Sequence, residues 1–307
     1  MRKHKSDPAA VTYSEVLMEH SAVLLIDCPD RPGLVARVSS LLYERGANIL
    51  HADQHQDHEL GLFFMRVEWG LAADEAARGG VFDLAGFERE FAALATELEM
   101  RWTLASSARR PRMALFCSQY LHCMADLLHR WHTGELHCEI PLIISNHCAV
   151  EKLAAFYGIH FEHVPVTAAT RAEAEARQLE LLAADEIDVV VLARYMQILS
   201  PGFVARYPSA VINVHHSFLP AFVGARPYHA AHARGVKLIG ATSHYVTEVL
   251  DDGPIIEQDV ARISHRDQVE DLVARGRDLE RIVLSRAVRW HLDRRILCYG
   301  NKTVVFD

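Results

Sequence analysis

Apolar and polar positions in the first hundred residues follow two periods, one typical of strands and one typical of helices. Helices are predicted where apolar residues recur three and four positions apart, as Leu34, Val38, Leu41 and Leu42 do. Apolar runs and simple alternation predict strands before, between and after two such helices. The four predicted strands cover residues 21–27, 47–57, 62–69 and 100–104. The resulting order, βαββαβ, is that of a ferredoxin-like module.

The first predicted helix has a start signal and a stop signal. Asp30 is expected to cap its N-terminus, because a short acceptor side chain ahead of an apolar face can bind the free amides of the first turn. Gly46 is expected to end it, since glycine readily adopts the left-handed conformation that closes a helix.

A second pattern begins after the polar, proline-broken segment 106–111, which we interpret as a linker. Seven apolar strands are predicted, and helix-length segments separate the first five, as in a doubly wound, mostly parallel α/β sheet. These strands cover residues 113–117, 140–145, 161–165, 187–192, 210–214, 237–246 and 255–260. Residues 295–307 predict a hairpin. We therefore expect a flexible N-terminal segment, residues 1–18, followed by two domains. Residues 19–105 are expected to form a regulatory domain, and residues 112–307 a catalytic domain.

Composition narrows the class of protein. The chain has 307 residues and a formal charge of −8, which argues against a nucleic-acid partner. No apolar run approaches the length of a membrane span, and no apolar signal core follows the basic N-terminus. Six scattered cysteines without a C-x-x-C pair suit reduced thiols. We therefore expect a cytoplasmic protein with no membrane partner.

Chemistry is concentrated at the end of the strand near residue 214. Asn213 and His215 are two positions apart, so in an extended strand both side chains face the same way. In an open α/β sheet, ligands bind beyond the carboxyl ends of the strands, which is where this pair falls. An amide and an imidazole there can stabilise an oxygen that gains negative charge, and the imidazole can also carry a proton. A carboxylate from the Asp251-Asp252 loop could orient His215.

Further candidates complete this site or compete with it. The apolar loop Arg194–Leu199 follows a buried strand and could pack around a flat ring. Ser217 is a weak candidate nucleophile because no Gly-x-Ser-x-Gly elbow surrounds it. Cys117 and Cys123 are expected to be packing residues. From the residues alone, acyl transfer or hydrolysis without a metal or a covalent nucleophile is expected.

Three histidines, at positions 51, 55 and 58, have a spacing that would align them on a helix and so suggest a metal site. In the predicted strand, however, His51 and His55 share one face while His58 points away or lies in the turn. We therefore expect structural or interface residues there, and no metal site in the chain.

The motifs Asn213-Val214-His215 and Leu250-Asp251-Asp252-Gly253-Pro254 resemble those of the folate-dependent formyltransferase family. The resemblance implies catalytic roles for Asn213, His215 and Asp251. It implies that His216 and His244 help to position these three residues. It implies that the pterin ring of 10-formyltetrahydrofolate is bound as substrate, and that no cofactor is bound permanently. The residues implied for that substrate are Arg194, Tyr195, Met196, Gln197, Ile198, Leu199, Val246, Thr247 and Leu250.

The turn Asp27–Leu34 and the segment Gly46–Ile49 resemble the ACT domain, a family of modules that bind small amino acids at dimer interfaces. The resemblance implies an amino-acid effector and a homo-oligomer formed through this module. A module that only dimerises, with an empty pocket, is the alternative. The implied effector residues are Asp30, Arg31, Gly33, Leu34, Asn48 and Ile49.

The order of the two modules resembles the hydrolases of the formyltransferase family, which release formate for purine synthesis and balance the one-carbon folate pool. The loop Cys117–His122 contains no glycine, whereas a glycine-rich turn would be needed to bind the phosphate of a ribonucleotide acceptor. His216 stands where many transferases of the family carry proline. We therefore expect water as the acceptor. A glycinamide ribonucleotide formyltransferase and a non-catalytic folate or amino-acid sensor remain the alternatives.

Overall fold

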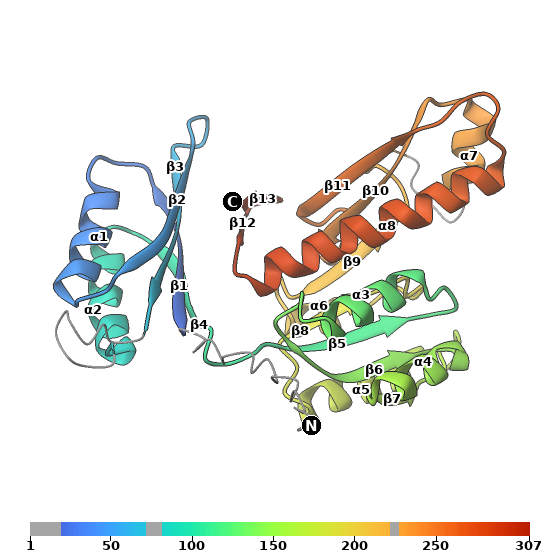
Figure 1. Cartoon of the computed structure of the whole chain (residues 1–307), viewed down its shortest axis with the longest axis horizontal. Coiled ribbons are helices and arrows are strands. Elements are labelled where there is room, and N and C mark those ends of the chain that lie inside the picture. The colour runs from blue at the N-terminus through green and yellow to red at the C-terminus, as the bar shows by residue number, and fades with distance from the viewer. Residues whose placement is uncertain (1–19, 72–81, 222–226) are drawn as a thin grey trace, which may run out of the picture.

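The computed structural model describes residues 20–71, 82–221 and 227–307. The N-terminal segment 1–18, expected to be flexible, lies outside the described residues. Two sheets organise the rest, and the chain passes from one to the other between Ser106 and Arg112 (Figure 1). No helix of the described part combines the length and hydrophobicity that a membrane span requires.

The first sheet has four antiparallel strands in the order β2-β3-β1-β4. Its elements are β1 (Ser21–Pro29), α1 (Leu34–Glu44), β2 (Ile49–Asp57), β3 (Leu62–Gly70), α2 (Leu84–Glu97) and β4 (Arg101–Ser106). The predicted order βαββαβ is confirmed. Alternate residues of β1 and β3, such as Leu24 and Met65, pack against both helices on one face of the sheet. His51 and His55 lie on strand β2 and are exposed, so these histidines do not line up on a helix.

The expected cap of α1 is wrong, whereas its expected end is confirmed. Gly33 stands before the helix with φ 91°, and no side chain caps the first turn. Because this left-handed turn separates Asp30 from the helix, the Asp30 carboxylate instead accepts a hydrogen bond from Gln56. Gly46 follows the helix with φ 76°, as a helix-ending glycine should.

The second sheet has seven strands in the order β11-β10-β9-β8-β5-β6-β7, and only β10 runs against the others. Its strands are β5 (Arg112–Cys117), β6 (Glu139–Ser145), β7 (His160–His163), β8 (Val189–Leu192), β9 (Val211–His215), β10 (Leu238–Tyr245) and β11 (Ile255–Arg262). The expected doubly wound, mostly parallel sheet is confirmed.

Helices cover both faces of this sheet. The connecting helices are α3 (His122–His132), α4 (Glu151–Tyr157), α5 (Arg171–Ala184), α6 (Pro201–Arg206), α7 (Pro227–Arg234) and α8 (Val269–Leu292), with a 3-10 turn at Cys148–Val150. Apolar residues of α3 and α8 pack on one face of the sheet, and those of α5 and α6 pack on the other. The long helix α8 runs across the antiparallel side of the sheet and contacts α3 and α7 (Figure 1).

A C-terminal hairpin joins the two sheets. Its strands, β12 (Ile296–Tyr299) and β13 (Lys302–Val305), confirm the predicted hairpin. Leu297 and Phe306 form a small apolar core with Leu25 and Phe64, which lie on the face of the first sheet opposite its helices. In addition, Arg66 of β3 donates a hydrogen bond to the carbonyl of Arg294, 3.0 Å away, just beyond α8.

We expect Phe306 to hold the hairpin on the first sheet. Its side chain is 1% exposed, so Phe306→Ala should lower the free energy of unfolding by about 3 kcal/mol or more, as measured by urea denaturation. Phe156→Ala is the matched control, because that ring is 79% exposed and its loss should cost less than about 0.5 kcal/mol. Equal effects of the two substitutions would contradict this role of Phe306.

Candidate active site

A cavity of about 320 Å³ opens where the carboxyl ends of β8 and β9 meet the loop after β10. Its lining comes from the segments 192–199, 213–216 and 244–251. The three predicted catalytic residues, Asn213, His215 and Asp251, all belong to that lining. The cavity therefore brings together Asn213 and Asp251, which are 38 positions apart in the sequence.

Strand pairing fixes the orientation of Asn213. Asn213 lies directly opposite His244 in the antiparallel pair of β9 and β10. Nδ1 of His244 is 2.9 Å from the carbonyl oxygen of Tyr245, which can only accept, so Nδ1 carries a proton. In the neutral ring, Nε2 is then an acceptor, and the Asn213 amide nitrogen donates to it over 3.2 Å. The second N–H of this amide remains for a ligand.

His215 carries an unpaired polar atom at the site. Its Nδ1 lies 3.3 Å from Oδ2 of Asp251, which favours a proton on that nitrogen. Its Nε2 is buried and has no hydrogen-bond partner among the described residues. Since His215 lines the cavity, a ligand there can supply the missing partner. The ring of His216 lies 5.0 Å from that of His215 and lines the same cavity.

The loop that carries Asp251 is closed tightly. Asp251 itself has φ 55°, a left-handed conformation that aspartate tolerates better than most residues. At Gly253, an added Cβ would lie 1.8 Å from the carbonyl oxygen of Tyr245, the same oxygen that binds His244. Glycine is therefore required there, because a side chain would displace the carbonyl that orients the imidazole.

Asp251 is held in its charged form. Burial alone would raise the pKa of this carboxyl, but its contacts with His215 and His244 outweigh burial and hold the pKa well below its ordinary value. Its second oxygen, Oδ1, lies 3.7 Å from Nε2 of His244, which is too far for a hydrogen bond. Asp251 is thus an ionised acceptor for Nδ1 of His215, with its other oxygen left free of a hydrogen bond to His244.

The predicted ring-binding loop has two kinds of residue. Met196 and Ile198 are about half exposed and flank the cavity, as an apolar wall for a flat ring should. Tyr195, in contrast, turns its ring into the core against Phe116, so only its backbone can meet a ligand. The remaining predicted ring-binding residues also line the cavity. These are Arg194, Gln197, Leu199, Val246, Thr247 and Leu250.

The hydroxyl and thiol groups that could compete as nucleophiles are hydrogen-bonded or buried. The Ser217 hydroxyl donates a hydrogen bond to the carbonyl of Ala221, 2.7 Å away. Cys117 is fully buried in the core, and burial raises its pKa to about 11, which keeps the thiol protonated. Neither side chain is activated for attack.

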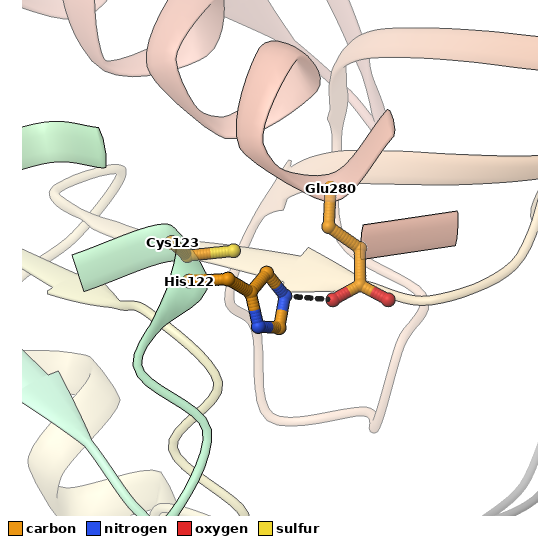
Figure 2. A group of neighbouring side chains, drawn as sticks. All are labelled: His122, Cys123 and Glu280. Atoms are coloured by element: carbon orange, nitrogen blue, oxygen red, sulfur yellow. Dashed lines mark hydrogen bonds and ion pairs between the residues drawn. The ribbon is translucent and has the colours of Figure 1, made fainter. Parts of the chain in front are cut away.

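A buried carboxylate beside the site is absent from the sequence predictions. Glu280 of α8 is 1% exposed. It accepts a hydrogen bond from His122, 2.7 Å away (Figure 2), and another from the hydroxyl of Tyr228, 2.8 Å away. Nε of Arg194 lies 3.4 Å from it. A signal for Glu280 existed in the sequence, since it lies four residues before Leu284 and therefore on the buried face of the helix.

Within the described residues, His122, Cys123 and Glu280 form a group whose donor atoms lie within 4.8 Å of one another (Figure 2). A divalent cation does not fit this group well. The guanidinium of Arg194 already contacts the same carboxylate oxygen as His122 and would repel a second cation. Burial also raises the pKa of Cys123 well above its ordinary value, which disfavours the thiolate that binds metals. We therefore interpret the group as a charge network.

The predicted effector residues do not meet within one chain. Asp30, Arg31, Gly33 and Leu34 follow the end of β1, whereas Asn48 and Ile49 lie at the start of β2. Because β1 and β2 run in the same direction on either side of β3, these two groups lie at opposite ends of the sheet, more than about 20 Å apart. A pocket containing both groups needs a second copy of the chain.

Comparisons with known proteins agree with both modules. The chain matches the family model "Formyl transferase" over residues 111–288 and the model "ACT domain" over residues 22–68. It is 52% identical to a formyltetrahydrofolate deformylase of Synechocystis sp., covering 93% of this chain and 98% of that protein. A crystal structure of a formyltetrahydrofolate deformylase from Pseudomonas syringae superposes with a TM-score of 0.90 at 49% identity, over 95% of this chain and 96% of the other.

A second kind of neighbour matches less of the chain. The structure of a glycinamide ribonucleotide transformylase from Symbiobacterium toebii is 28% identical, with a TM-score of 0.61. It covers 64% of this chain, although 95% of its own length is matched. The likeness to that enzyme is thus limited to part of the chain, whereas the likeness to the deformylases extends over both modules.

We expect Asp251 to make the free energy of unfolding depend on pH in the acid range. The folded pKa of Asp251 lies below the ordinary value of 3.8, so its stabilising contribution is fully present above that value and is lost as the pH falls below it. Between about pH 5 and about pH 3, Asp251→Asn should therefore lose less free energy of unfolding than the wild type. Urea denaturation measures this, with the exposed neighbour variant Asp252→Asn as control. An acid loss that is the same in all three proteins would contradict the expectation.

Proposed function

This chain belongs to the formyltetrahydrofolate deformylases of the formyl transferase family, and we infer that it hydrolyses 10-formyltetrahydrofolate to formate and tetrahydrofolate. The observation that carries this inference is the convergence of Asn213, His215 and Asp251 on one cavity. The similarity of the chain to deformylases over both modules supports water, rather than an amine, as the acceptor.

We propose that Asn213 and His215 stabilise the oxyanion that forms when water adds to the formyl carbon. Asn213 offers the N–H that His244 leaves free, and its amide is already oriented before substrate arrives. His215 offers Nε2, the buried nitrogen that has no partner of its own. Donors that are fixed in advance and shielded from water stabilise a developing charge without a cost of reorganisation.

Asp251 supports this chemistry from the opposite side of the imidazole. Its ionised carboxylate faces Nδ1 and stabilises the charged form of His215. Its other oxygen is beyond hydrogen-bond distance of His244 and can accept a proton or a hydrogen bond from the attacking water. As the carbon–nitrogen bond breaks, His215 is placed to return a proton to N10 of the folate.

The apolar loops give the substrate its orientation. Met196 and Ile198 on one side and Leu250 on the other expose apolar surface around the cavity, and we propose that they sandwich the pterin ring. Backbone amides and carbonyls of the same loops match the heteroatoms of the ring.

We also propose that the first module binds a small amino acid between two copies of the chain. The ACT-domain match supports an amino-acid ligand. Because the residues after β1 and those at the start of β2 lie at opposite ends of one sheet, the pocket would combine the first group of one copy with the second group of its partner.

The proposed mechanism is tested by Asp251→Asn. This substitution keeps the size of the side chain but removes its charge, so formate release should fall by about 100- to 1000-fold. Binding of folate, measured by calorimetry, should change little, because the apolar loops are untouched. Asp252→Asn, which alters an exposed neighbour, should retain wild-type turnover. Hydrolysis by Asp251→Asn at a near wild-type rate would refute the assignment.

The same assay distinguishes the hydrolase from its alternatives. Formate should appear from 10-formyltetrahydrofolate without any acceptor, and glycinamide ribonucleotide should not increase turnover. Turnover that requires the ribonucleotide would instead indicate a transferase. A complete absence of turnover would indicate a folate-binding sensor.

The proposed effector site is tested by titrating single amino acids against formate release while the mass of the assembly is followed by light scattering. At least one amino acid should change the rate of an oligomeric enzyme. Asn48→Ala should shift its half-maximal concentration without altering the basal rate, whereas Glu88→Ala, an exposed change on α2, should not. A monomer that responds to no amino acid would contradict the proposal.

A further inference from the structure

The crevice in which an open α/β sheet usually receives a ligand is spanned by hydrogen bonds in this chain. The chain runs from β5 outward through β6 and β7, and then returns to β8 and β9 on the other side, so the switch point lies between β5 and β8. There, Ser118 donates its amide to the Arg194 carbonyl over 3.2 Å. Its hydroxyl accepts from the Met196 amide over 3.0 Å and donates to Asn146 over 2.7 Å. The two loops are thereby tied together.

Glu280 connects helix α8 to the same two loops. Its carboxylate accepts a hydrogen bond from His122 at the start of α3 (Figure 2). It also accepts one from Tyr228 of α7 and forms an ion pair with Arg194 of the loop after β8. Burial alone would raise the pKa of Glu280, but these three contacts outweigh burial and lower it. The carboxylate is therefore charged and fully enclosed. We call His122, Arg194, Tyr228 and Glu280 the Glu280 network.

Arg194 is the member of this network that also lines the cavity. Its side chain is 10% exposed and its Nε has no hydrogen bond among the described residues. The ring of Tyr120 lies 5.4 Å from the guanidinium carbon and covers it. Held by Glu280 and covered by Tyr120, the guanidinium is fixed in place beside the cavity and is not a mobile surface charge.

The cavity that remains is small. Its volume of about 320 Å³ is close to the lower limit, roughly 300 Å³, of sites that hold small molecules. One ring system with its formyl group and a water fill such a space. The crevice that Ser118 and the loop of Arg194 bridge borders this cavity, because Arg194 lines it.

We propose that the Glu280 network determines the acceptor of the reaction, because it holds Arg194 across the switch-point crevice and admits only water to the formyl carbon. This proposal rests on the deformylase function inferred above. In the permitted step, the water oxygen bonds to the formyl carbon, the bond from that carbon to N10 breaks, and N10 takes a proton. On this proposal, the fixed guanidinium blocks the approach of a larger amine.

The proposal predicts that removal of this guanidinium admits an amine. Glycinamide is the probe, and formate and N-formylglycinamide from 10-formyltetrahydrofolate are quantified by mass spectrometry. The wild type should form formate alone. In Arg194→Ala, the ratio of N-formylglycinamide to formate should rise at least about tenfold above the wild-type detection limit. This ratio does not depend on how tightly folate is bound.

A second variant distinguishes the loss of the Arg194 side chain from misfolding caused by an unpaired buried charge. Arg194→Ala leaves a buried charge unpaired, whereas Arg194→Ala with Glu280→Gln removes both charges and should give the same increase in ratio. The matched control is Arg277→Ala, which removes an exposed arginine whose guanidinium carbon lies 5.9 Å from the centre of the Tyr120 ring, outside the cavity. This control should form formate alone.

Two outcomes would overturn the proposal. In the first, the opened variants release formate but form no more N-formylglycinamide than the wild type. In the second, both folded variants lose all turnover, which would make Arg194 a catalytic residue. Failure of the deformylase function itself is distinguishable, because the wild type would then release no formate.

Discussion

The antiparallel pairing of β10 with β9 is the constraint on which the active site depends. It places His244 directly opposite Asn213, so that an imidazole and an amide from different strands meet over 3.2 Å. A shift of β10 by one residue would turn His244 to the other face of the sheet, away from Asn213. The same strand leads into the loop that returns Asp251 to His215. One reversed strand in an otherwise parallel sheet thus orients the amide, the imidazole and the carboxylate together.

Most of the fold and the centre of the site were predictable because their signals are local. Strand and helix periods identified the elements of both sheets, and the two-residue spacing of Asn213 and His215 placed their side chains on one face. Asp30 was misjudged as a cap because the left-handed turn at Gly33 is decided by backbone geometry, which composition does not reveal. Tyr195 lines the cavity as expected, but the inward direction of its ring was not predictable because the neighbours of that ring, Phe116 and Gln178, come from other elements.

Glu280 illustrates what a single sequence hides. On an amphipathic helix, a glutamate is normally read as part of the solvated face, and the reason for its burial is found elsewhere in the chain. Its partner Tyr228 is 52 residues away and its partner His122 is 158 residues away. Neither partner is distinctive by itself. A buried charge of this kind becomes visible only when the fold brings its donors together, although its position on the apolar stripe of α8 is a usable warning.

The C-terminal hairpin has a consequence for how the protein is made. Phe64 and Phe306 belong to one apolar core, yet the ribosome adds them more than 240 residues apart in the sequence. At 5–20 residues per second, on the order of 10–50 s pass between the two additions. The first sheet can pack its helices early in synthesis, but its other face stays bare until the hairpin emerges. For that interval the nascent chain exposes the apolar side chains of Leu25 and Phe64, which the hairpin later covers.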